Sequence, residues 1–446
     1  MEIKELYEIF LASAGVNTDT RTIRENQLFI ALKGENFDGN AFAEKALEAG
    51  AAYAVVSDRK GSTDPRLIEV PDTLRTLQEL AAWHRRQLRI PVIGLTGTNG
   101  KTTTKELIRA VLAQKYRVSA TEGNLNNDIG VPLTVLKIRP DTEIAIVEMG
   151  ASHPEDLRPL LAVSQPTHGL ITNVGKAHLE GFGSFEGVRH AKGLLYDYLK
   201  AHGGTVFCNA SDLVLQGMLE EREIQDRIPY NAAGDAKVLP SSPEAPFLRL
   251  RMGRNPVLET QLVGAYNAAN VLAALAVGAF FGVPGTAGRA AIAAYCPSNN
   301  RSQLLRTARN TVIVDAYNAN PSSMAVALDN LAAMSGSRAA LLGEMRELGA
   351  DSVAEHAAIL KRLSGMGLDC VCLVGEEFKK AAAEISSEVE KSEISPRASL
   401  GRDGKALFFD TSDALAAHLA AHPITGCTVL VKGSRGTRME KVLPAL

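Results

Sequence analysis

The chain has 446 residues and a mass of 47.6 kDa, and 48 Lys and Arg residues against 50 Asp and Glu residues leave a net charge of -2. Hydrophobic residues make up 46% and charged residues 22%, which excludes a disordered chain, a collagen-like repeat and a small disulfide scaffold. The balanced charge also argues against a nucleic-acid-binding protein and a polybasic membrane anchor.

The N-terminal residues and the cysteines both indicate an intracellular protein. The first 15 residues, MEIKELYEIFLASAG, predict an amphipathic helix with acidic residues and lack the pattern of a signal peptide. Five scattered cysteines do not indicate a disulfide framework. Residues 261–288 carry no charge, but their alanines, asparagines and the sequence Gly282-Val-Pro284 favour a buried helix over a membrane span. We therefore expect a cytoplasmic protein without stable membrane insertion.

Predicted elements divide the chain into three blocks. The first block is expected to hold a strand, a helix and a strand, at 27–32, 41–49 and 52–57. In the second, the apolar run Ile90–Leu95 predicts a buried strand that leads into a glycine-rich turn and a helix from Thr102. Three more strands are expected there, at 143–147, 169–172 and 204–209. Residues 244–255 are typical of an antiparallel addition to this block.

The third block follows the sequence Asn299-Asn300-Arg301. It begins with an expected strand at 311–315 and a helix at 321–334. Further strands are expected at 339–342, 370–374, 406–410 and 428–431. Strands that alternate with helices predict a parallel α/β sheet, so we expect such a sheet in the second block and a doubly wound sheet in the third.

A glycine-rich loop joins the strand Ile90–Leu95 to the following helix, with the sequence Gly97-Thr98-Asn99-Gly100-Lys101-Thr102-Thr103. Glycines let backbone N–H groups converge on phosphate oxygens, and the helix N-terminus adds its positive dipole end. Lys101 would reach the β- and γ-phosphates of a nucleotide, and the Thr102 hydroxyl would bind Mg²⁺. The strict pattern would have glycine where this chain has Leu95, so an ordinary glycine-rich turn is the alternative. The loop alone does not distinguish a kinase, an NTPase or a ligase.

Several motifs together give the chain a resemblance to a known family. The loop Gly97–Thr103 resembles the ATP loop of the Mur ligases, the enzymes that build the stem peptide of peptidoglycan. Further segments extend this resemblance over nearly the whole chain: Asp19–Arg21, Ala31–Gly34 with Asp38-Gly39, Asn124–Pro132, Glu148–Gly150, Thr172–Ser184, Asp315–Pro321, Leu342–Gly349 and Val431–Gly436. These segments are most similar to the family member that adds the last two residues of the stem peptide.

The resemblance implies a three-domain α/β fold, in which a central P-loop-type parallel sheet is flanked by an N-terminal UDP-sugar domain and a C-terminal Rossmann-like domain. The implied bounds are 1–88 for the UDP-MurNAc-binding domain, 89–301 for the ATP-binding domain and 302–446 for the Rossmann-like domain. The implied cofactors are ATP and Mg²⁺.

The implied reaction joins D-alanyl-D-alanine (D-Ala-D-Ala) to UDP-N-acetylmuramoyl-tripeptide (UDP-MurNAc-tripeptide). ATP phosphorylates the terminal carboxylate of the tripeptide, the amine of the dipeptide attacks the acyl phosphate, and phosphate leaves. Bringing an anionic carboxylate to an anionic γ-phosphate requires cations and the exclusion of water. We expect a monomer that takes these small substrates and no nucleic acid.

The resemblance assigns Mg²⁺ to Thr102, Glu148, His178 and Lys192. Histidine is an unusual ligand here, because Mg²⁺ prefers oxygen. A lysine at the position of Lys192 is often carbamylated in the family, which converts a cation into an anionic oxygen ligand. This chain has Leu194 where an acidic residue is common. From the residues alone, a solvated strand-end acid, a surface histidine and a salt-bridging lysine are the alternatives.

Other residues are assigned to the nucleotide. Asn267 and Asn270 lie three apart on one predicted helix and suit adenine, with polar packing as the alternative. Arg301 would reach the γ-phosphate when the domains close, unless it is only a linker residue. Asp315 ends a predicted strand, where acidic residues commonly bind ribose hydroxyls. The implied catalytic residues are Lys101, Lys192, His178 and Arg301.

The candidate substrate-binding residues come from two blocks. In the third block they are Tyr317, Asn318 and Asn320, although Asn320 before Pro321 is also typical of a helix start. In the first block the candidates for the UDP-MurNAc end are Thr20, Arg21, Lys33 and Gly34, with solvated loop charges as the alternative.

Three alternative functions can be compared with the motifs. A folylpolyglutamate synthase or another Mur ligase would share the loop and Lys192, but not the pair of segments 126–132 and 315–320. A non-catalytic regulator should have lost Lys101, Glu148 or His178, all of which are present. A P-loop NTPase would hydrolyse ATP without an amino acceptor. The motifs leave open whether the third residue of the tripeptide is meso-diaminopimelate or lysine.

Overall fold

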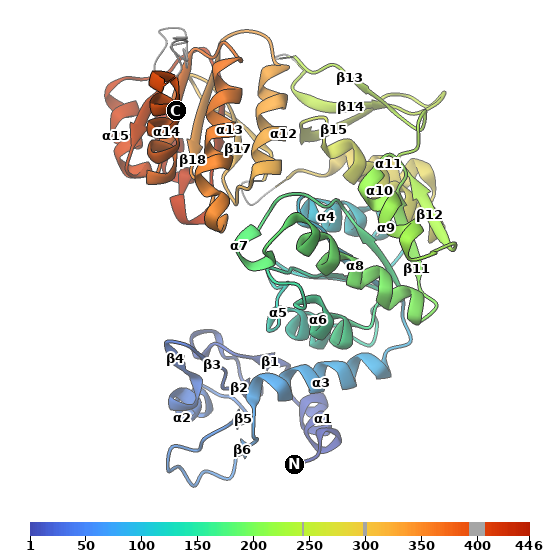
Figure 1. Cartoon of the computed structure of the whole chain (residues 1–446). Coiled ribbons are helices and arrows are strands. Elements are labelled where there is room, and N and C mark those ends of the chain that lie inside the picture. Colours follow the sequence, from blue (N-terminus) through green and yellow to red (C-terminus); the bar gives the residue numbers. More distant parts are fainter. Residues whose placement is uncertain (243–244, 298–300, 392–405) are drawn as a thin grey trace.

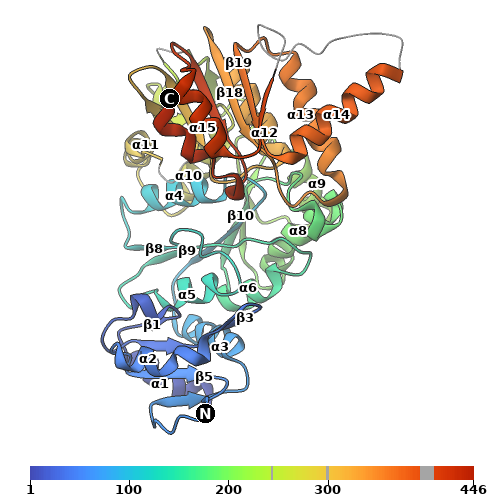
Figure 2. The ribbon, with the colours of Figure 1, turned by 90° about the vertical axis from the view of Figure 1, so that its left-hand side faces the viewer.

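A computed structural model describes residues 1–242, 245–297, 301–391 and 406–446. The chain forms three parts, each built around its own parallel or mostly parallel sheet. Figure 1 shows the central part between the N-terminal part, in blue, and the C-terminal part, in orange and red. Figure 2 shows the same succession from the side.

The N-terminal part carries a four-stranded parallel sheet in the order β1-β2-β5-β6. Its strands are β1 (Val16–Asn17), β2 (Leu28–Ile30), β5 (Tyr53–Val56) and β6 (Leu67–Glu69), and β3 (Lys33–Gly34) and β4 (Phe37–Asp38) form a separate hairpin. Its helices are α1 (Ile3–Ala12), α2 (Ala43–Glu48) and α3 (Thr73–Gln87), with 3₁₀ turns η1 (Thr20–Thr22) and η2 (Gly39–Phe42). The expected N-terminal amphipathic helix is confirmed, since α1 buries Leu6, Tyr7 and Phe10 on one face.

The central part holds a six-stranded sheet in the order β12-β11-β10-β7-β9-β8, with every pairing parallel. Its strands are β7 (Val92–Thr96), β8 (Val118–Ala120), β9 (Ile144–Glu148), β10 (His168–Ile171), β11 (Thr205–Asn209) and β12 (Arg227–Tyr230). Its helices are α4 (Lys101–Leu112), α5 (Gly130–Leu136), α6 (Leu157–Ser164), α7 (Leu179–Phe182), α8 (Phe185–Ala201), α9 (Leu213–Glu221), α10 (Asn267–Phe280) and α11 (Gly285–Ala294). The predicted parallel sheet is thus confirmed.

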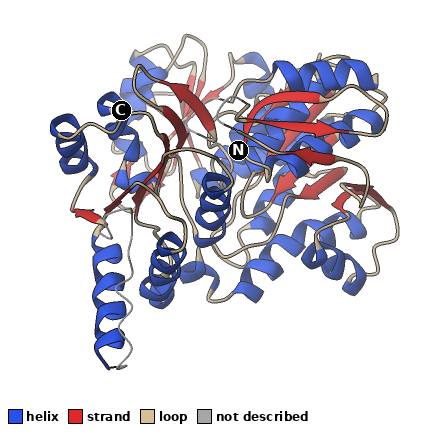
Figure 3. Ribbon diagram, turned by 90° about the horizontal axis from the view of Figure 1, so that it is seen from above, coloured by secondary structure: helices blue, strands red, loops and turns tan. Residues whose placement is uncertain are grey.

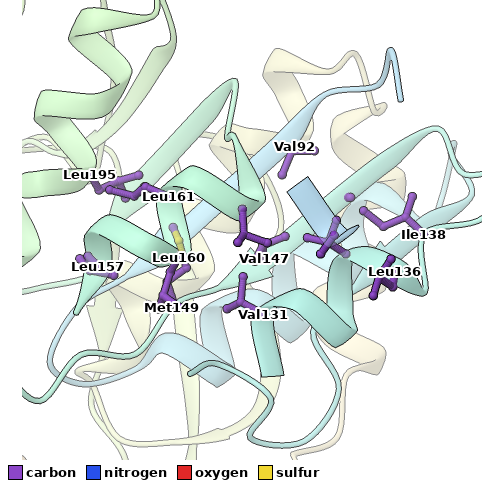
Figure 4. Close-up of a cluster of buried hydrophobic side chains, with 14 of the residues drawn as sticks. Val92, Val131, Leu136, Ile138, Val147, Met149, Leu157, Leu160, Leu161 and Leu195 are labelled. Carbon is purple, nitrogen blue, oxygen red and sulfur yellow. The ribbon is translucent and has the colours of Figure 1, made fainter. Parts of the chain in front are cut away.

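Helices cover both faces of the central sheet because its strands are apolar on both faces. On β9, Ala145 and Val147 pack with α5, α6 and α8, while Ile144 and Ile146 pack with α4, α10 and α11. Figure 4 shows the first of these layers, where leucines of α6 lie near Val147. The uncharged stretch 261–288 forms mainly α10, which packs against α4 as the predicted buried helix. Among the helices of the described residues, none is long and apolar enough to cross a membrane.

A three-stranded antiparallel sheet is added to the central part, as predicted for 244–255. It consists of β13 (Lys237–Leu239), β14 (Phe247–Arg251) and β15 (Leu258–Val263). The first residue of the predicted segment lies outside the described residues.

The C-terminal part holds a six-stranded sheet in the order β16-β17-β21-β18-β19-β20. Its strands are β16 (Gln303–Arg306), β17 (Thr311–Asp315), β18 (Arg338–Gly343), β19 (Cys370–Val374), β20 (Leu407–Phe409) and β21 (Thr428–Lys432), and only β16 pairs in the antiparallel sense. Its helices are α12 (Pro321–Ala332), α13 (Ser352–Ser364), α14 (Glu376–Lys391) and α15 (Ser412–Ala421), with 3₁₀ turns η3 (Gly349–Asp351), η4 (Arg435–Thr437) and η5 (Met439–Ala445). Helices lie on both sides of this sheet, which is the predicted doubly wound arrangement (Figure 3).

Helix α3 fixes the N-terminal part on the central part. It packs against α5 and α6, and the two parts share one hydrophobic cluster. Near its end, the buried His84 places Nε2 3.1 Å from the carbonyl oxygen of Ile138. The buried Arg85 donates to the carbonyl oxygens of Ser164 and Gln165, both at 3.0 Å. These carbonyls lie at the C-terminus of α6, so the arginine places its positive charge at the negative end of that helix dipole.

Candidate active site

A cleft of about 1330 Å³ lies between the central and C-terminal sheets. The loops that follow β7, β9, β17, β18 and β21 line it, so the carboxyl ends of parallel strands from both sheets face one space. This is where open α/β sheets usually bind ligands. The N-terminal part reaches the rim through Gln78, whose side chain donates to the carbonyl oxygen of Asp128 at 3.2 Å.

The glycine-rich loop has the backbone that a phosphate cradle requires. Gly97 has φ 142°, and a Cβ there would lie 2.0 Å from Thr172 Oγ1. Gly100 has φ 76° and is the residue from which α4 begins. The N–H groups of Thr98 and Asn99 are held by the backbone oxygen and the side-chain oxygen of Asn173, both at 3.0 Å. The loop is therefore fixed to the strand end of β10, and both glycines are needed for its path.

Lys101 lies over the loop and faces the cleft. Its Nζ donates to the carbonyl oxygens of Gly97 at 2.7 Å and Thr98 at 3.1 Å. Burial lowers the pKa of Lys101, and the charge of Arg301 lowers it further, whereas Glu148 raises it. Of the predicted loop residues, those that line the cleft are Thr98, Asn99, Gly100, Lys101 and Thr103.

Behind the loop, a buried carboxylate lies beside a hydroxyl. Glu148 at the end of β9 is 1% exposed, and Thr102 Oγ1 lies 3.0 Å and 3.2 Å from its two oxygens. Asn126 Nδ2 donates to the same carboxylate at 2.9 Å. Glu148 and Asn126 line the cleft, while Thr102 lies behind its wall. The two predicted residues Thr102 and Glu148 therefore lie in contact. Asn126, to which the sequence assigned no role, is a third member of this group.

His178 immediately precedes α7 as its N-cap residue and has φ 50°, in the left-handed region. Its Nδ1 contacts the carboxylate of Glu347, which lies on the loop after β18 and also has a positive φ, 62°. The close contact with His178 is the main cause that lowers the pKa of Glu347. Both side chains line the cleft. In the sequence, Glu347 belongs to a segment that carries the family resemblance, but no function could be assigned to it. The spacing of the motifs does not show that Glu347 contacts His178.

Lys192 lies inside the central part rather than in the cleft wall. It is 2% exposed, and its Nζ donates to the carbonyl oxygen of Ala151 at 3.3 Å and lies 5.3 Å from the centre of the Phe182 ring. Burial lowers its pKa well below the usual value, and the charge of Lys101 lowers it further. Ala151 lines the cleft, so Lys192 stands one residue behind its surface. Among the described residues, no group of three or more His, Cys, Asp or Glu side chains is arranged for a metal ion.

The two asparagines of α10 face the phosphate loop. Asn270 Oδ1 accepts from Thr104 Oγ1 at 3.0 Å, and its Nδ2 donates to Asn267 Oδ1 at 2.9 Å. Asn267 in turn donates to the carbonyl oxygen of Val263 at 2.8 Å. Both line the cleft. The chain of hydrogen bonds supports the polar-packing interpretation, and the position in the cleft supports the predicted nucleotide contact.

The hinge residue Arg301 and the predicted residues of the third block form the opposite wall. The guanidinium of Arg301 lies 3.8 Å from the centre of the Tyr317 ring. Asn320 donates to Asn99 Oδ1 at 2.8 Å across the cleft and also caps α12, so the predicted helix start is confirmed. Asp315 binds the buried Lys432 at 2.5 Å. Arg301, Asp315, Tyr317, Asn318 and Asn320 all line the cleft.

The four candidates of the first block lie elsewhere. Arg21 is held by Asp19, with its Nη2 2.6 Å from that carboxylate, next to Thr20 in the turn η1. Lys33 and Gly34 form the exposed strand β3. None of the four lines the cleft.

Comparisons with known proteins match this architecture. Models of the Mur ligase family catalytic domain, the Mur ligase middle domain, and the Mur ligase glutamate ligase domain match residues 13–86, 95–278 and 300–435. The UDP-N-acetylmuramoyl-tripeptide--D-alanyl-D-alanine ligase of Escherichia coli is 36% identical over 97% of this chain and 93% of its own. The chain belongs to the Mur ligase family.

Solved structures of Mur ligases share the whole fold. A crystal structure of MurF from Acinetobacter baumannii is 27% identical, with a TM-score of 0.83 over 99% of this chain and 97% of that one. MurF ligase from Thermotoga maritima in complex with ADP is 26% identical, with a TM-score of 0.80 over 98% and 97% of the two chains. The expected three-domain Mur ligase architecture is therefore confirmed, with the cleft described above between its central and C-terminal domains.

Proposed function

We infer that this Mur ligase is an ATP-dependent enzyme that joins D-Ala-D-Ala to UDP-MurNAc-tripeptide through an acyl phosphate, and so supplies UDP-MurNAc-pentapeptide for peptidoglycan synthesis. The observation that carries this inference is the match to the tripeptide--D-alanyl-D-alanine ligase of Escherichia coli over nearly the full length of both chains. The phosphate loop at the centre of a two-walled cleft supplies the matching chemistry.

The residues of the cleft suit the transfer of a phosphoryl group to a carboxylate. Lys101 and the N–H groups of the first turn of α4 lie where the phosphates of ATP would be held, and Arg301 faces them from the hinge. The Nε of Arg301 is buried and has no hydrogen-bond partner among the described residues, which suits an anionic ligand. When the C-terminal domain closes, these cations would draw the two anionic reactants together and exclude water.

The donor set beside the loop fits Mg²⁺, which we propose as the metal of this site. Glu148 is a buried carboxylate for which no ion pair exists among the described residues, and Thr102 adds a hydroxyl oxygen. Hard oxygen donors next to phosphates are what Mg²⁺ prefers. A bound Mg²⁺ would neutralise negative charge on the phosphate oxygens. We propose His178 and carbamylated Lys192 as ligands nearer the reacting carboxylate.

The remaining assignments are also proposals. Those for ATP are Asn267, Asn270 and Asp315, and those for the peptide are Tyr317, Asn318 and Asn320. For the UDP-MurNAc end they are Thr20, Arg21, Lys33 and Gly34, which would form a separate subsite on the N-terminal domain. We propose domain bounds of 1–88, 89–301 and 302–446.

We further propose that the enzyme acts as a monomer in the cytoplasm. ATP and UDP-linked precursors are cytoplasmic metabolites, which supports the location.

Product formation should require ATP, UDP-MurNAc-tripeptide and D-Ala-D-Ala together. Without the dipeptide we expect little phosphate release, because closure of the cleft keeps water from the acyl phosphate. Phosphate release and product mass, measured with each substrate omitted in turn, test this expectation. Rapid ATP turnover without a peptide acceptor would instead favour an NTPase. Comparison of tripeptides that end in meso-diaminopimelate or lysine would identify the third residue.

Replacing Glu148 by glutamine should raise the Mg²⁺ concentration needed for half-maximal rate at least about tenfold, because a neutral amide is a poor metal ligand. The amide oxygen can still accept from Thr102 and Asn126, so the fold should be retained. Glu143→Gln is the matched control, since Glu143 lies just before the same strand and binds the N–H of Arg117. The Mg²⁺ concentration at half-maximal rate is the measurement. An unchanged Mg²⁺ requirement would remove Glu148 from the metal site.

A further inference from the structure

Two loops from different domains meet at the edge of the cleft. One is the segment 173–182 of the central domain, which ends in α7, and the other is the segment 344–351 that follows β18 of the C-terminal domain. The N–H of Glu180 donates to the carbonyl oxygen of Glu347 at 3.3 Å. Leu179 and Phe182 belong to the same hydrophobic cluster as Leu348. The C-terminal domain is therefore docked on the loop that carries His178.

Two further contacts join the central and C-terminal domains next to these loops. Lys176 Nζ binds Glu355 at 2.6 Å, and the N–H of Lys176 donates to Ser322 Oγ at 2.9 Å. A Cβ at Gly175 would lie 2.7 Å from the same Ser322 Oγ, so the two backbones approach closely there. Each of these contacts joins a residue of the central domain to a residue of the C-terminal domain. They can therefore form only when the two domains have this relative position.

Within this interface, His178 and Glu347 are the pair that faces the cleft. Both have non-glycine left-handed backbones, with φ of 50° and 62°. Such strained residues cluster at functional sites, where the surrounding structure imposes them. The Glu347 side chain is 60% exposed, and exposed ion pairs add little to stability. The contact is therefore better explained by what it does to the imidazole than by a contribution to folding.

The contact bears on which ring nitrogen of His178 would be free to bind a ligand. An imidazole that carries its proton on Nδ1 would turn that N–H toward the Glu347 carboxylate and leave its lone pair on Nε2. The ring of Phe182 packs edge to face against the imidazole, with centroids 6.4 Å apart, and limits its rotation. Carboxylate partners of this kind orient histidine ligands in metal sites.

We propose that Glu347 is a positioning residue that fixes the ring and the tautomer of His178, so that docking of the C-terminal domain completes a metal ligand on the central domain. The proposal rests on the proposed function, because it uses His178 as a ligand. It connects domain placement to metal binding, since the orienting carboxylate belongs to the domain that closes.

Metal binding without turnover tests the proposal directly. Binding of Mn²⁺ to the whole chain with saturating ADP can be measured from the EPR signal of free Mn²⁺. Glu347→Ala should weaken the His178-dependent Mn²⁺ site about 10- to 100-fold. Glu347→Gln, which keeps an acceptor oxygen, should restore part of this loss. His178→Ala should lose the same site, and the double variant should bind Mn²⁺ no more weakly than His178→Ala alone.

A control variant separates orientation of His178 from docking of the domains. Glu355→Gln breaks the ion pair with Lys176 in the same interface but leaves Glu347 intact, so its Mn²⁺ affinity should stay within about twofold of the unchanged protein. Thermal melts of all variants show whether they fold, and Glu347→Asn, which tolerates a left-handed backbone, replaces Glu347→Ala if the latter does not fold.

Four results would overturn the proposal. Unchanged Mn²⁺ binding by Glu347→Ala would remove Glu347 from the metal site, and tighter binding would mean that the ion pair holds His178 away from the metal. A further loss in the double variant would show that Glu347 acts independently of His178. Normal Mn²⁺ binding by His178→Ala would remove its role as a ligand. Ligation by the unchanged protein, measured separately, tests the proposed function itself.

Discussion

Replacing Lys101 by alanine should reduce the rate of ligation by about a hundred- to a thousandfold, the usual loss when one well-placed charged contact to a transition state is removed. Its ammonium group is the cation of the loop, and burial makes its charge act strongly on nearby phosphate oxygens. Its Nζ binds the carbonyl oxygens of Gly97 and Thr98, so the side chain is held over the cradle.

The variant should fold normally, because the two hydrogen bonds of Lys101 are local to the loop while α4 is held by its apolar face. Lys115→Ala is the matched control. Lys115 follows α4 at its other end and donates to the carbonyl oxygens of Phe281 and Gly282, away from the cleft. Ligation rate, ADP affinity and thermal melting should be measured for both variants. Near-normal ligation by Lys101→Ala would make the phosphate-loop assignment wrong.

The main strands could be predicted because they are buried on both faces. The apolar runs at 311–315 and 428–431 become β17 and β21, which pair in parallel at the centre of the C-terminal sheet. The position of the glycine-rich loop could also be predicted. A loop that joins a buried parallel strand to the following helix lies at the carboxyl edge of the sheet. At these residues the apolar sequence pattern predicts a buried strand, and the strand is buried in the structure.

Elements that depend on a neighbour could not be predicted. No strand was predicted at the four residues of β16, which are too few to show a period and pair in antiparallel with β17. Strand β1 has two residues, too few to show a period. The hydrogen bond between Asn126 and Glu148 joins residues 22 positions apart, and nothing in the intervening sequence indicates it. Such contacts follow from the placement of loops, which hydrophobic periodicity does not describe.

The limits of motif reasoning are clearest for two cations, Arg301 at the hinge and Lys432 in the third block. Sequence reasoning treated Arg301 as a hinge residue that waits for phosphate, and the structure shows its guanidinium stacked on Tyr317 at 3.8 Å. The buried Lys432 is already neutralised by Asp315. Arg301 is thus the better candidate for an anionic substrate group, because a stacked guanidinium keeps its hydrogen-bond donors available.

Lys192→Arg and Lys192→Ala should both lose about a hundredfold or more in ligation rate, because we propose that Lys192 acts as a carbamate and neither residue can form one. Carbamate formation joins the unprotonated amine to CO₂ and releases one proton. Burial lowers the pKa of Lys192 well below its usual value, which favours the unprotonated amine. The charge of Lys101, which further disfavours an ammonium at this position, would favour the anionic product.

The surroundings of Lys192 support this interpretation. Its Nζ has one hydrogen bond, a long one to Ala151, and among the described residues no carboxylate lies within ion-pair distance, although the charge of Asp156 raises its pKa. A buried ammonium without a counter-ion is costly, whereas a carbamate beside a metal would be paired. Acetate added to Lys192→Ala should restore part of the rate by supplying the missing oxygens, and it should not help Lys192→Arg, whose side chain fills the site.

Lys200→Arg is the matched control for these variants, since Lys200 lies in the same helix α8 on its exposed side and should tolerate the change. Solution NMR of the unchanged enzyme with ¹³C-labelled bicarbonate should show a carbamate signal that both Lys192 variants lack. Ligation rates with and without acetate then complete the comparison. A fully active Lys192→Arg would show that position 192 needs only a positive charge, and the carbamate would have to be abandoned in favour of a cation that holds the anionic substrates.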